Sequence, residues 1–289
     1  MPNSPPTLNL IGAGRVGQTL ARLWHTQGVF TVQDVHTRSG ASAQAACAFI
    51  GAGQACSDMG SLRAADVWML AVPDAQIASV ALALAHAQTA SPTTNPVNAS
   101  HAPIAFHCSG AQAADRLAPL AALGWACASA HCILSFASPS TALAQFAGTP
   151  CALEGAPSAC ARLEQAFATV GAQCFTVASQ DKLLYHAGAV FATNFLPVLQ
   201  QVAEDVWRAS GVPAPLITQL RNRLLHNAAD NICRLGPQVA LTGPAARGDL
   251  NAIATQAAAV TAWDAPSGEA YRSLSALALR MAGHELLKK

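Results

Sequence analysis

Five polar side chains interrupt a segment that otherwise holds only apolar residues and glycine: Lys182, Tyr185, His186, Thr193 and Asn194. If this segment is a helix, Lys182, His186 and Thr193 share one face, because residues four and seven positions apart lie above one another. Tyr185 and Asn194 then flank that face. A lysine placed in this way can give a proton to a substrate, while His186 and Asn194 can orient it. The segment is therefore a candidate catalytic helix.

Ser179 is a candidate amino-terminal cap for this helix and would place Lys182 in its first turn. The positive end of the helix and partial burial would both lower the pKa of the lysine, as a general acid requires. The residues alone leave a second interpretation open. Lys182 is then an ordinary solvated lysine, and His186 is a core histidine with satisfied hydrogen bonds.

A reduction also needs a hydride donor, and the glycine pattern near the amino terminus indicates one. The pattern directly follows the apolar run 7–11 and reads Gly12, Ala13, Gly14, Arg15, Val16, Gly17. The first glycine permits the tight turn from strand to helix, the second leaves room for a pyrophosphate, and the third allows helix and strand to pack closely. The phosphates then meet the free N–H groups at the helix start. We predict a dinucleotide site rather than a merely structural turn.

The end of the second predicted strand, residues 29–35, indicates which dinucleotide binds. There the sequence reads Thr37-Arg38-Ser39, in which Arg38 can bind a 2′-phosphate and the two hydroxyls can donate hydrogen bonds. NADP is therefore favoured over NAD. Asp34 could instead hold the ribose hydroxyls of NAD if the strand ended earlier.

Other residues that could bind a ligand follow further predicted strands. Val72 and Pro73 end the third long apolar run, Ser109 follows the fourth, and His131 follows the fifth. In a doubly wound sheet, ligands bind at the carboxyl ends of the strands. We expect Val72, Pro73 and Ser109 to contact the cofactor and Ser109 to help position the substrate. His131 could polarise a carbonyl group or be structural, and the sequence favours neither.

Strand and helix patterns alternate up to about residue 178, and only helical patterns follow. The predicted strands are 7–11, 29–35, 65–72, 103–107, 125–130, 149–153 and 173–177. The predicted helices after the first are 41–50, 75–87, 158–170, 180–206, 215–234, 249–262 and 268–287. We expect an α/β protein with a doubly wound Rossmann domain over 1–178 and an all-helical domain over 179–289. Residues 88–100, polar and containing prolines, are predicted to form an exposed, mobile loop.

The charge balance excludes some classes of partner. Sixteen basic and 15 acidic residues leave a net charge of +1 with no basic run, so we expect no nucleic acid and no anionic membrane surface. Only 11% of the residues are charged and 52% are apolar. Some apolar surface is expected to lie between subunits, although the abundant alanine also raises the apolar count.

The compartment follows from the terminus and the cysteines. The first six residues lack the basic and apolar regions of a secretory signal, and the longest apolar stretches are broken by polar residues and proline. Nine cysteines without a C-x-x-C pair indicate buried reduced thiols, and hence a cytoplasmic protein. Soft ligands do gather near neighbouring strand ends, but their spacing fits no common zinc pattern, so no metal is expected.

Arg247 is a further candidate. It lies between two glycines, just before a predicted helix that Asp249 would cap. It could bind a substrate carboxylate or form an ion pair with Asp249, and the ion pair is slightly favoured.

The motifs together resemble one bacterial family. The segments that carry the resemblance are the 12–17 glycine turn, Val72-Pro73-Asp74, His107-Cys108-Ser109-Gly110, His131 with Ser135-Phe136, the 182–186 segment with Asn194-Phe195, and the 243–249 segment. Over nearly its whole length, the sequence resembles Rossmann-like proteins with a carboxyl-terminal domain of unknown function 2520, which are often labelled NADP oxidoreductases.

The resemblance implies a fold similar to ketopantoate reductase, pyrroline-5-carboxylate reductase and the β-hydroxyacid dehydrogenases. It also implies a helical domain similar to that of 6-phosphogluconate dehydrogenase and a homodimer built through it. In the hydroxyacid and ketopantoate enzymes a catalytic lysine begins a K-x-x-x-N motif. Lys182 occupies the lysine position, and His186 stands in place of the asparagine. Family members often have His-Pro where this chain has His131-Cys132.

We therefore expect an NADP-dependent oxidoreductase that transfers a hydride between NADP(H) and a small carbonyl, hydroxy or imine substrate at the interdomain cleft. Lys182 would be the acid, and His186, Asn194 and Ser109 would position the substrate. A non-catalytic sensor or scaffold that binds NADP is the alternative, because the same glycines serve both. The sequence does not name the substrate.

Overall fold

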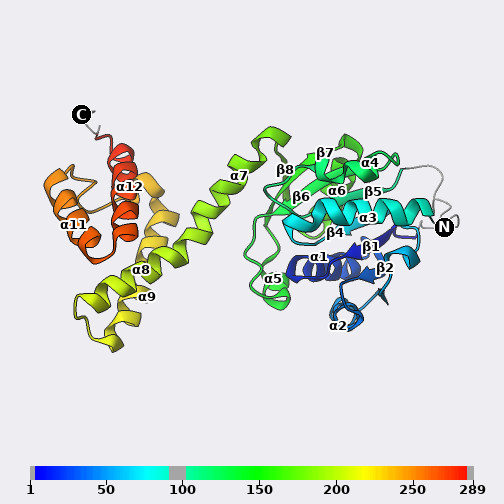
Figure 1. The fold of residues 1–289 in the computed structure, drawn as a ribbon, viewed down its shortest axis with the longest axis horizontal. Coiled ribbons are helices and arrows are strands. Elements are labelled where there is room, and N and C mark those ends of the chain that lie inside the picture. Colours follow the sequence, from blue (N-terminus) through cyan, green and yellow to red (C-terminus); the bar gives the residue numbers. More distant parts are fainter. Residues whose placement is uncertain (1–3, 91–101, 285–289) are drawn as a thin grey trace. The chain divides into compact units, whose positions relative to one another are not determined.

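A computed structural model describes residues 4–90 and 102–284 of the chain (Figure 1). The chain divides into two compact units, residues 1–190 and residues 191–289. By their contacts, residues 179–190 therefore group with the first unit. Among the described residues, no helix is both long enough and apolar enough to cross a lipid bilayer.

The first unit is built on an eight-stranded sheet. Its strands are β1 (Thr7–Ile11), β2 (Thr31–His36), β3 (Gln54–Cys56), β4 (Val67–Leu70), β5 (Ile104–His107), β6 (Ala126–Cys132), β7 (Pro150–Gly155) and β8 (Gln173–Thr176). Their order across the sheet is β3-β2-β1-β4-β5-β6-β7-β8. All neighbouring strands are parallel except β6 and β7. The predicted doubly wound sheet is thus confirmed, with one reversal that was not predicted.

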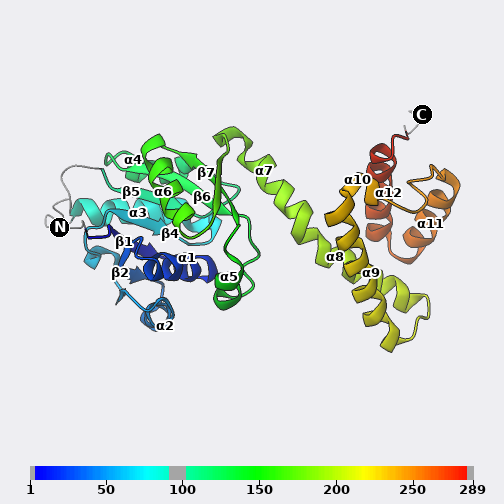
Figure 2. The ribbon, with the colours of Figure 1, turned by 180° about the vertical axis from the view of Figure 1, so that it is seen from behind.

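Helices cover both faces of this sheet (Figures 1 and 2). The helices of the first unit are α1 (Arg15–Thr26), α2 (Gly40–Ile50), α3 (Ile77–Ala90), α4 (Ala118–Ala121), α5 (Pro139–Gln145), α6 (Pro157–Thr169) and α7 (Lys182–Ala189). Residues of α1, α2 and α6 form one hydrophobic core with the sheet, and residues of α3 and α4 form the other. In the first core, Trp24 of α1 makes edge contacts with Phe30, Phe106 and Phe167.

The reversal at β7 follows from a short connection. Residues 133–149 contain only the two-turn helix α5 and bring the chain directly from the carboxyl end of β6 into β7. A parallel pair would need a crossover that returns the chain to the opposite edge of the sheet. The chain therefore runs back beside β6, and Ser129 pairs with Glu154 across the two strands.

Several elements differ from the sequence-based predictions. The edge strand β3 and the helices α4 and α5 were not predicted, because each is short and carries too few residues to show a period. Strand β6 continues to Cys132, so His131 lies inside the strand and does not follow it. Gln88–Ala90 belong to α3 rather than to the predicted loop, and the rest of that loop lies outside the described residues.

The second unit is helical, as predicted. Its helices are α8 (Phe195–Ala209), α9 (Ala214–Leu235), α10 (Pro237–Ala240), α11 (Leu250–Trp263) and α12 (Ala265–Met281). The predicted helix 180–206 is not one regular helix, because a π-helical segment, Val190–Asn194, separates α7 from α8. Helix α12 ends at Met281, earlier than predicted, and α10 is an added short helix. Asp249 caps α11 with its carboxylate, as predicted.

Candidate functional site

The glycine turn between β1 and α1 has the geometry that its sequence predicts. Gly12 has a φ of +82°, and an added Cβ would lie 2.6 Å from the carbonyl oxygen of Ala71 and from Cγ1 of Val72. At Gly17, an added Cβ would lie 2.8 Å from the carbonyl oxygen of Gly12. Both positions require glycine because atoms of the turn itself or of the residues after β4 approach them closely.

Gly14 differs from its two neighbours in the motif. Its φ of −72° is one that any residue can adopt, and an added Cβ would meet no atom within 4 Å. Gly14 is also the cap residue of α1 and offers no side chain to the free N–H groups of the first turn. The turn therefore presents bare backbone to open space at the positive end of a helix, as a dinucleotide site needs. A diphosphate fits this arrangement.

Other residues of the turn are held locally. The carbonyl oxygen of Ala13 accepts a bond of 2.6 Å from Nε2 of Gln18. Arg15 is exposed and donates a long bond of 3.4 Å to the carbonyl oxygen of Phe136. Val16 packs against the first core. These contacts fix the path of the chain around Gly14.

Beyond β2, Arg38 is exposed, whereas its neighbours are engaged. The hydroxyl of Thr37 donates to the carbonyl oxygen of Ser39 at 2.8 Å, and the hydroxyl of Ser39 caps α2 by accepting from the N–H of Ser42. The prediction that both hydroxyls serve a phosphate remains untested. Arg38 stands at the start of α2 without an ion-pair partner among the described residues.

The alternative role for Asp34 is wrong. Strand β2 continues to His36, and the Asp34 side chain is buried. Its carboxylate accepts hydrogen bonds from the backbone N–H and the guanidinium of Arg63. A carboxylate committed in this way cannot hold ribose hydroxyls.

The turns after β4 and β5 are joined by hydrogen bonds. The hydroxyl of Ser109 donates to Oδ2 of Asp74 at 2.6 Å and accepts from the N–H groups of Ala111 and Gln112. Asp74 follows Val72 and Pro73 directly. The Ser109 hydroxyl is therefore engaged within the protein, and its carbonyl oxygen is the group that faces the candidate acid.

The candidate acid, Lys182, is the centre of a buried polar network. Its side chain is 1% exposed. Its ammonium donates to the carbonyl oxygen of Ser109 at 3.2 Å and to Oγ of Ser129 at 2.7 Å. Ser129 in turn donates to Oε2 of Glu154 at 2.9 Å. The solvated-lysine interpretation is therefore wrong.

The hydrogen bonds of Lys182 leave it suited to give up a proton. Two of the three N–H groups of the ammonium are used, and the third has no acceptor among the described residues. Burial lowers the pKa of the lysine below its ordinary value, while the charges of Glu154 and Asp74 partly oppose that shift. A lowered pKa brings a lysine closer to the range in which general acids work.

Ser179 does not have the role predicted for it. It opens a 3-10 turn, and α7 begins at Lys182 with Asp181 as its cap residue. The Ser179 hydroxyl donates to Oε1 of Glu154 at 2.7 Å. A hydrogen bond to a buried carboxylate is stronger than the bond that a capping serine accepts from a helix N–H, so Glu154 determines the orientation of the Ser179 side chain.

A cluster of aromatic side chains adjoins the lysine. His131 Nδ1 lies 2.8 Å from the Tyr185 hydroxyl, and the rings of His131 and His186 meet edge to face. Both imidazoles lie against Gly110, where an added Cβ would be 2.4 Å from Nδ1 of His186 and 2.8 Å from Cε1 of His131. Nδ1 of His186 is buried and has no hydrogen-bond partner in the described part of the chain. An unpaired ring nitrogen at such a place can bind a substrate polar group.

Burial, and then the charges of His186 and Lys182, lower the pKa of His131 to about 4. We therefore expect His131 to be neutral near pH 7, with the Tyr185 hydroxyl as donor. Burial also raises the pKa of Tyr185 to about 12, which keeps that hydroxyl protonated.

His131 should make the protein sensitive to acid. The unfolded chain binds a proton here near pH 6.5 and the folded chain only near pH 4, so stability is lost as the pH falls across that window. As the pH falls from 6.5 to about 4, the free energy of unfolding in urea should decrease by about 3 kcal/mol more for wild type than for His131→Gln, since each pKa unit corresponds to about 1.4 kcal/mol. Parallel pH curves for the two proteins would contradict the buried neutral imidazole.

The remaining candidates lie elsewhere. Asn194 belongs to the second unit, where its Oδ1 accepts from the Thr193 hydroxyl at 2.9 Å. Arg247 and Asp249 do not form an ion pair in the part of the chain that the structure describes. Within residues 4–90 and 102–284, no three His, Cys, Asp or Glu side chains converge as a metal site would require.

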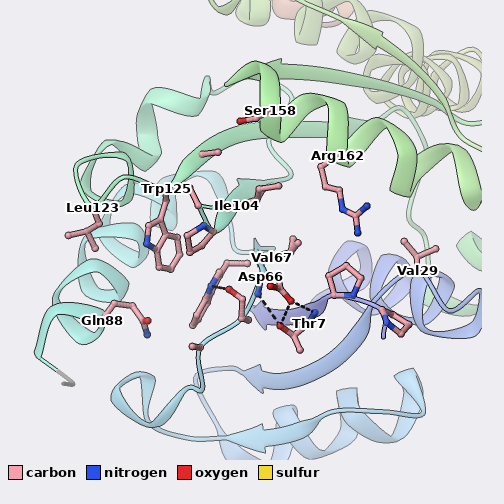
Figure 3. Close-up of a pocket in the computed structure, with 18 of the residues that line it drawn as sticks. Thr7, Val29, Asp66, Val67, Gln88, Ile104, Leu123, Trp125, Ser158 and Arg162 are labelled. Atoms are coloured by element: carbon pink, nitrogen blue, oxygen red, sulfur yellow. Dashed lines mark hydrogen bonds between the residues drawn. The ribbon is translucent and has the colours of Figure 1, made fainter. Parts of the chain in front are cut away.

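A hollow lies at the opposite edge of the sheet. Its volume is about 1360 Å³, and it is lined by the first residues of β1, β4, β5 and β6 (Figure 3). Figure 3 shows Trp125 and Arg162 on its walls and Asp66 bonded to Thr7. Because α1 and the other helices after the strands begin at the carboxyl edge, their positive ends lie far from this hollow. This hollow therefore lacks the helix N-termini that a diphosphate site needs.

Sequence reasoning missed Ser129 and Glu154. Ser129 lies in a strand that was predicted from its apolar residues, and Glu154 comes directly after the predicted strand 149–153, although β7 continues to Gly155. One signal was available: both are polar residues within runs of otherwise apolar strand residues, where an unpaired polar group is costly.

This fold and site define a class of protein: a Rossmann-like sheet unit with a dinucleotide turn, followed by a helical unit. Residues 4–132 match the model of the Rossmann-like domain, and residues 149–278 match a domain of unknown function (DUF2520). The chain therefore carries a Rossmann-like domain followed by a DUF2520 domain, which confirms the resemblance. Comparison with curated proteins gave no significant match.

Solved structures of similar fold include three of special relevance. Protein TM1727 from Thermotoga maritima is 22% identical, with a TM-score of 0.73 over 96% of this chain and 98% of that one. Protein BF3122 from Bacteroides fragilis, whose name calls it a candidate NADP oxidoreductase, is 20% identical, with a TM-score of 0.71 over 96% and 99%. An imine reductase from Myxococcus stipitatus in complex with NADP+ is 17% identical, with a TM-score of 0.63 over 96% of each chain. These identities show the fold alone.

Proposed function

We propose that this protein is an NADP-dependent oxidoreductase that transfers a hydride between NADP(H) and a small carbonyl, hydroxy or imine compound. The observation that carries the proposal is a buried lysine, Lys182, at the carboxyl edge of a sheet that also bears an open dinucleotide turn; no described residue accepts the third N–H of this lysine. The fold is also shared with an imine reductase in complex with NADP+, so a fold of this kind can hold the proposed cofactor.

The residues divide the work as follows. The backbone around Gly14 would hold the diphosphate, and Arg38 the 2′-phosphate. NADPH, when bound, supplies the hydride. Lys182 gives the proton of its third N–H to the substrate oxygen or nitrogen, while Ser109 and Ser129 hold the ammonium in place.

The histidines would position the substrate. Nδ1 of His186 has no hydrogen-bond partner among the residues that the structure describes, and the ring of His131, bonded to Tyr185, lies beside it. A polar group of the substrate that binds His186 would lie near Gly110, within the same cluster as the acid.

The first test is a screen of NADPH oxidation in the presence of small oxo acids, aldehydes, ketones and cyclic imines. The absorbance of NADPH at 340 nm monitors the reaction. We expect turnover with at least one class. NADPH binding by calorimetry without turnover across the panel would instead identify a sensor or scaffold that binds NADP. Absence of binding by any nicotinamide dinucleotide would remove both functions.

Cofactor choice should depend on Arg38. Replacing it with alanine should weaken NADPH binding by about tenfold to a hundredfold, because charged hydrogen bonds contribute about 1.5–3 kcal/mol. NADH binding should change little, since NADH has no 2′-phosphate. Titration of both dinucleotides measures this, with Arg116→Ala, another exposed arginine, as the control. Equal losses for NADPH and NADH would contradict the assignment.

We also propose a homodimer through the second unit. No residue of α8 is buried, and its apolar side chains Phe195, Leu196, Val198 and Leu199 are all exposed. Leu224 and Ile232 on α9 are exposed as well. An apolar surface of this extent favours association with a second copy.

Light scattering after size exclusion should give about twice the chain mass of 29.6 kDa. Val198→Asp should shift the protein towards monomer, because it places a charge on the apolar face of α8. Gln201→Ala, a change at an exposed polar position of the same helix, should not. A wild-type monomer at micromolar concentration would exclude the dimer.

A further inference from the structure

A buried carboxylate stands behind the candidate acid. Glu154 is 7% exposed and lies opposite Ser129 in the antiparallel pair of β6 and β7. Ser129 also pairs with His107, the last residue of β5, so the register places it at the carboxyl edge of the neighbouring strand. The Lys182 ammonium reaches this same point. The three side chains form one continuous chain of hydrogen bonds, Lys182 to Ser129 to Glu154.

Glu154 accepts hydrogen bonds from two serines that position Lys182, Ser129 and Ser179. Oε2 accepts from the Ser129 hydroxyl, which contacts the ammonium, and from the N–H of Ala114 at 2.8 Å. Oε1 accepts from the hydroxyl of Ser179, three residues before Lys182. One carboxylate thus holds the start of the segment that leads into α7 and, through Ser129, the tip of the lysine that α7 carries.

We propose that Glu154, acting through Ser129 and Ser179, is a positioning residue for Lys182 that keeps its ammonium charged and aims its third N–H at the substrate. The inference rests on the proposed function for its catalytic meaning. The arrangement itself is independent of any substrate, because every contact in it is internal.

The surroundings of Lys182 make this charge important. Asp74 and Glu154 favour the ammonium, whereas the thiol of Cys151 on β7, whose pKa is raised, carries no charge. Burial disfavours the charged ammonium, and the nearby imidazoles of His107 and His131 supply no negative charge to offset this effect. Asp74 is already bonded to Ser109. Removing the charge of Glu154 would therefore leave burial less opposed, and Lys182 should lose its proton at a lower pH.

The lysine content of the chain allows a direct measurement. Lys182, Lys288 and Lys289 are its only lysines. Protein labelled with ¹³C at lysine Cε should therefore give three lysine signals, and the one that Lys182→Arg removes belongs to Lys182. We expect Glu154→Gln to lower the titration midpoint of that signal by about one pH unit or more. The other two signals should not move, and Glu164→Gln, at an exposed glutamate of α6, should leave all three unchanged.

Kinetics provide the second readout. In Glu154→Gln, the basic limb of the kcat/KM profile should move to lower pH by the same amount, with little change in the KM for NADPH. Ser129→Ala should lower kcat at neutral pH by about tenfold, and Ser129→Thr, which keeps the hydroxyl, should restore most of it. A merely structural role would not move a pH limb.

The outcomes separate two failures. If the Lys182 signal titrates identically in folded wild type and Glu154→Gln, the inference is wrong whatever the enzyme does. If the signal shifts but no substrate is turned over, the positioning stands and the proposed function fails. Should Glu154→Gln not fold, Ser129→Ala takes its place in the same titration, and an unmoved signal there overturns the inference.

Discussion

Replacing Lys182 with alanine will lower kcat for NADPH-dependent reduction by about a hundredfold or more, while the Kd for NADPH stays within about twofold of wild type. The lysine keeps one N–H that no described residue accepts. Its partner Ser109 lies in the turn after β5, and its partner Ser129 lies in β6. Neither belongs to the glycine turn. Losing the amine therefore removes the proton donor and leaves the diphosphate site intact.

Stopped-flow or steady-state oxidation of NADPH measures this effect, and fluorescence titration measures binding. Lys182→Arg is the matched control, because arginine keeps the positive charge but does not release its proton. It should be nearly as slow as the alanine variant. Wild-type turnover in Lys182→Ala would remove the lysine from the mechanism, provided that circular dichroism shows a folded protein.

The fold could be predicted wherever a local pattern carries the information. The turn from β1 to α1 is encoded by three glycines, and two of them have no tolerance for a side chain. The strands β4 and β5 are short apolar runs buried on both faces, as parallel strands are. The direction of β7 could not be predicted, because it depends on how far a 17-residue connection, residues 133–149, carries the chain across the sheet.

The site could be predicted in part for the same reason. Lys182 and His186 share a helical face, so their proximity is local. The partners of Lys182 are not local: Ser109 is 73 residues away and Ser129 is 53 residues away. Glu154 meets Ser129 only through the unpredicted antiparallel register. Ser179 was assigned to a cap because capping is the local option, but a buried carboxylate from another strand takes its hydroxyl.

Gly14→Val should abolish dinucleotide binding while leaving the protein folded. The added side chain meets no protein atom at the position of Cβ, and the backbone φ of −72° suits valine. Valine is a poorer cap than glycine, which costs about 1 kcal/mol of folding free energy. The space that the side chain fills is the space proposed for the diphosphate, so NADPH affinity should fall by at least about a hundredfold.

Two matched variants give this result its meaning. At Gly17 an added Cβ lies 2.8 Å from the carbonyl oxygen of Gly12, so Gly17→Ala should lower thermal stability before it affects binding. At Gly188, in α7, an added Cβ again meets open space, so Gly188→Val should preserve both folding and NADPH affinity. A selective loss in Gly14→Val, seen by calorimetry with NADPH, therefore locates the diphosphate at this turn. Full NADPH affinity in folded Gly14→Val would mean that the open space beside α1 is not the cofactor site. The roles proposed for Arg38 and Lys182 would then fail as well, because both assume a diphosphate at this turn.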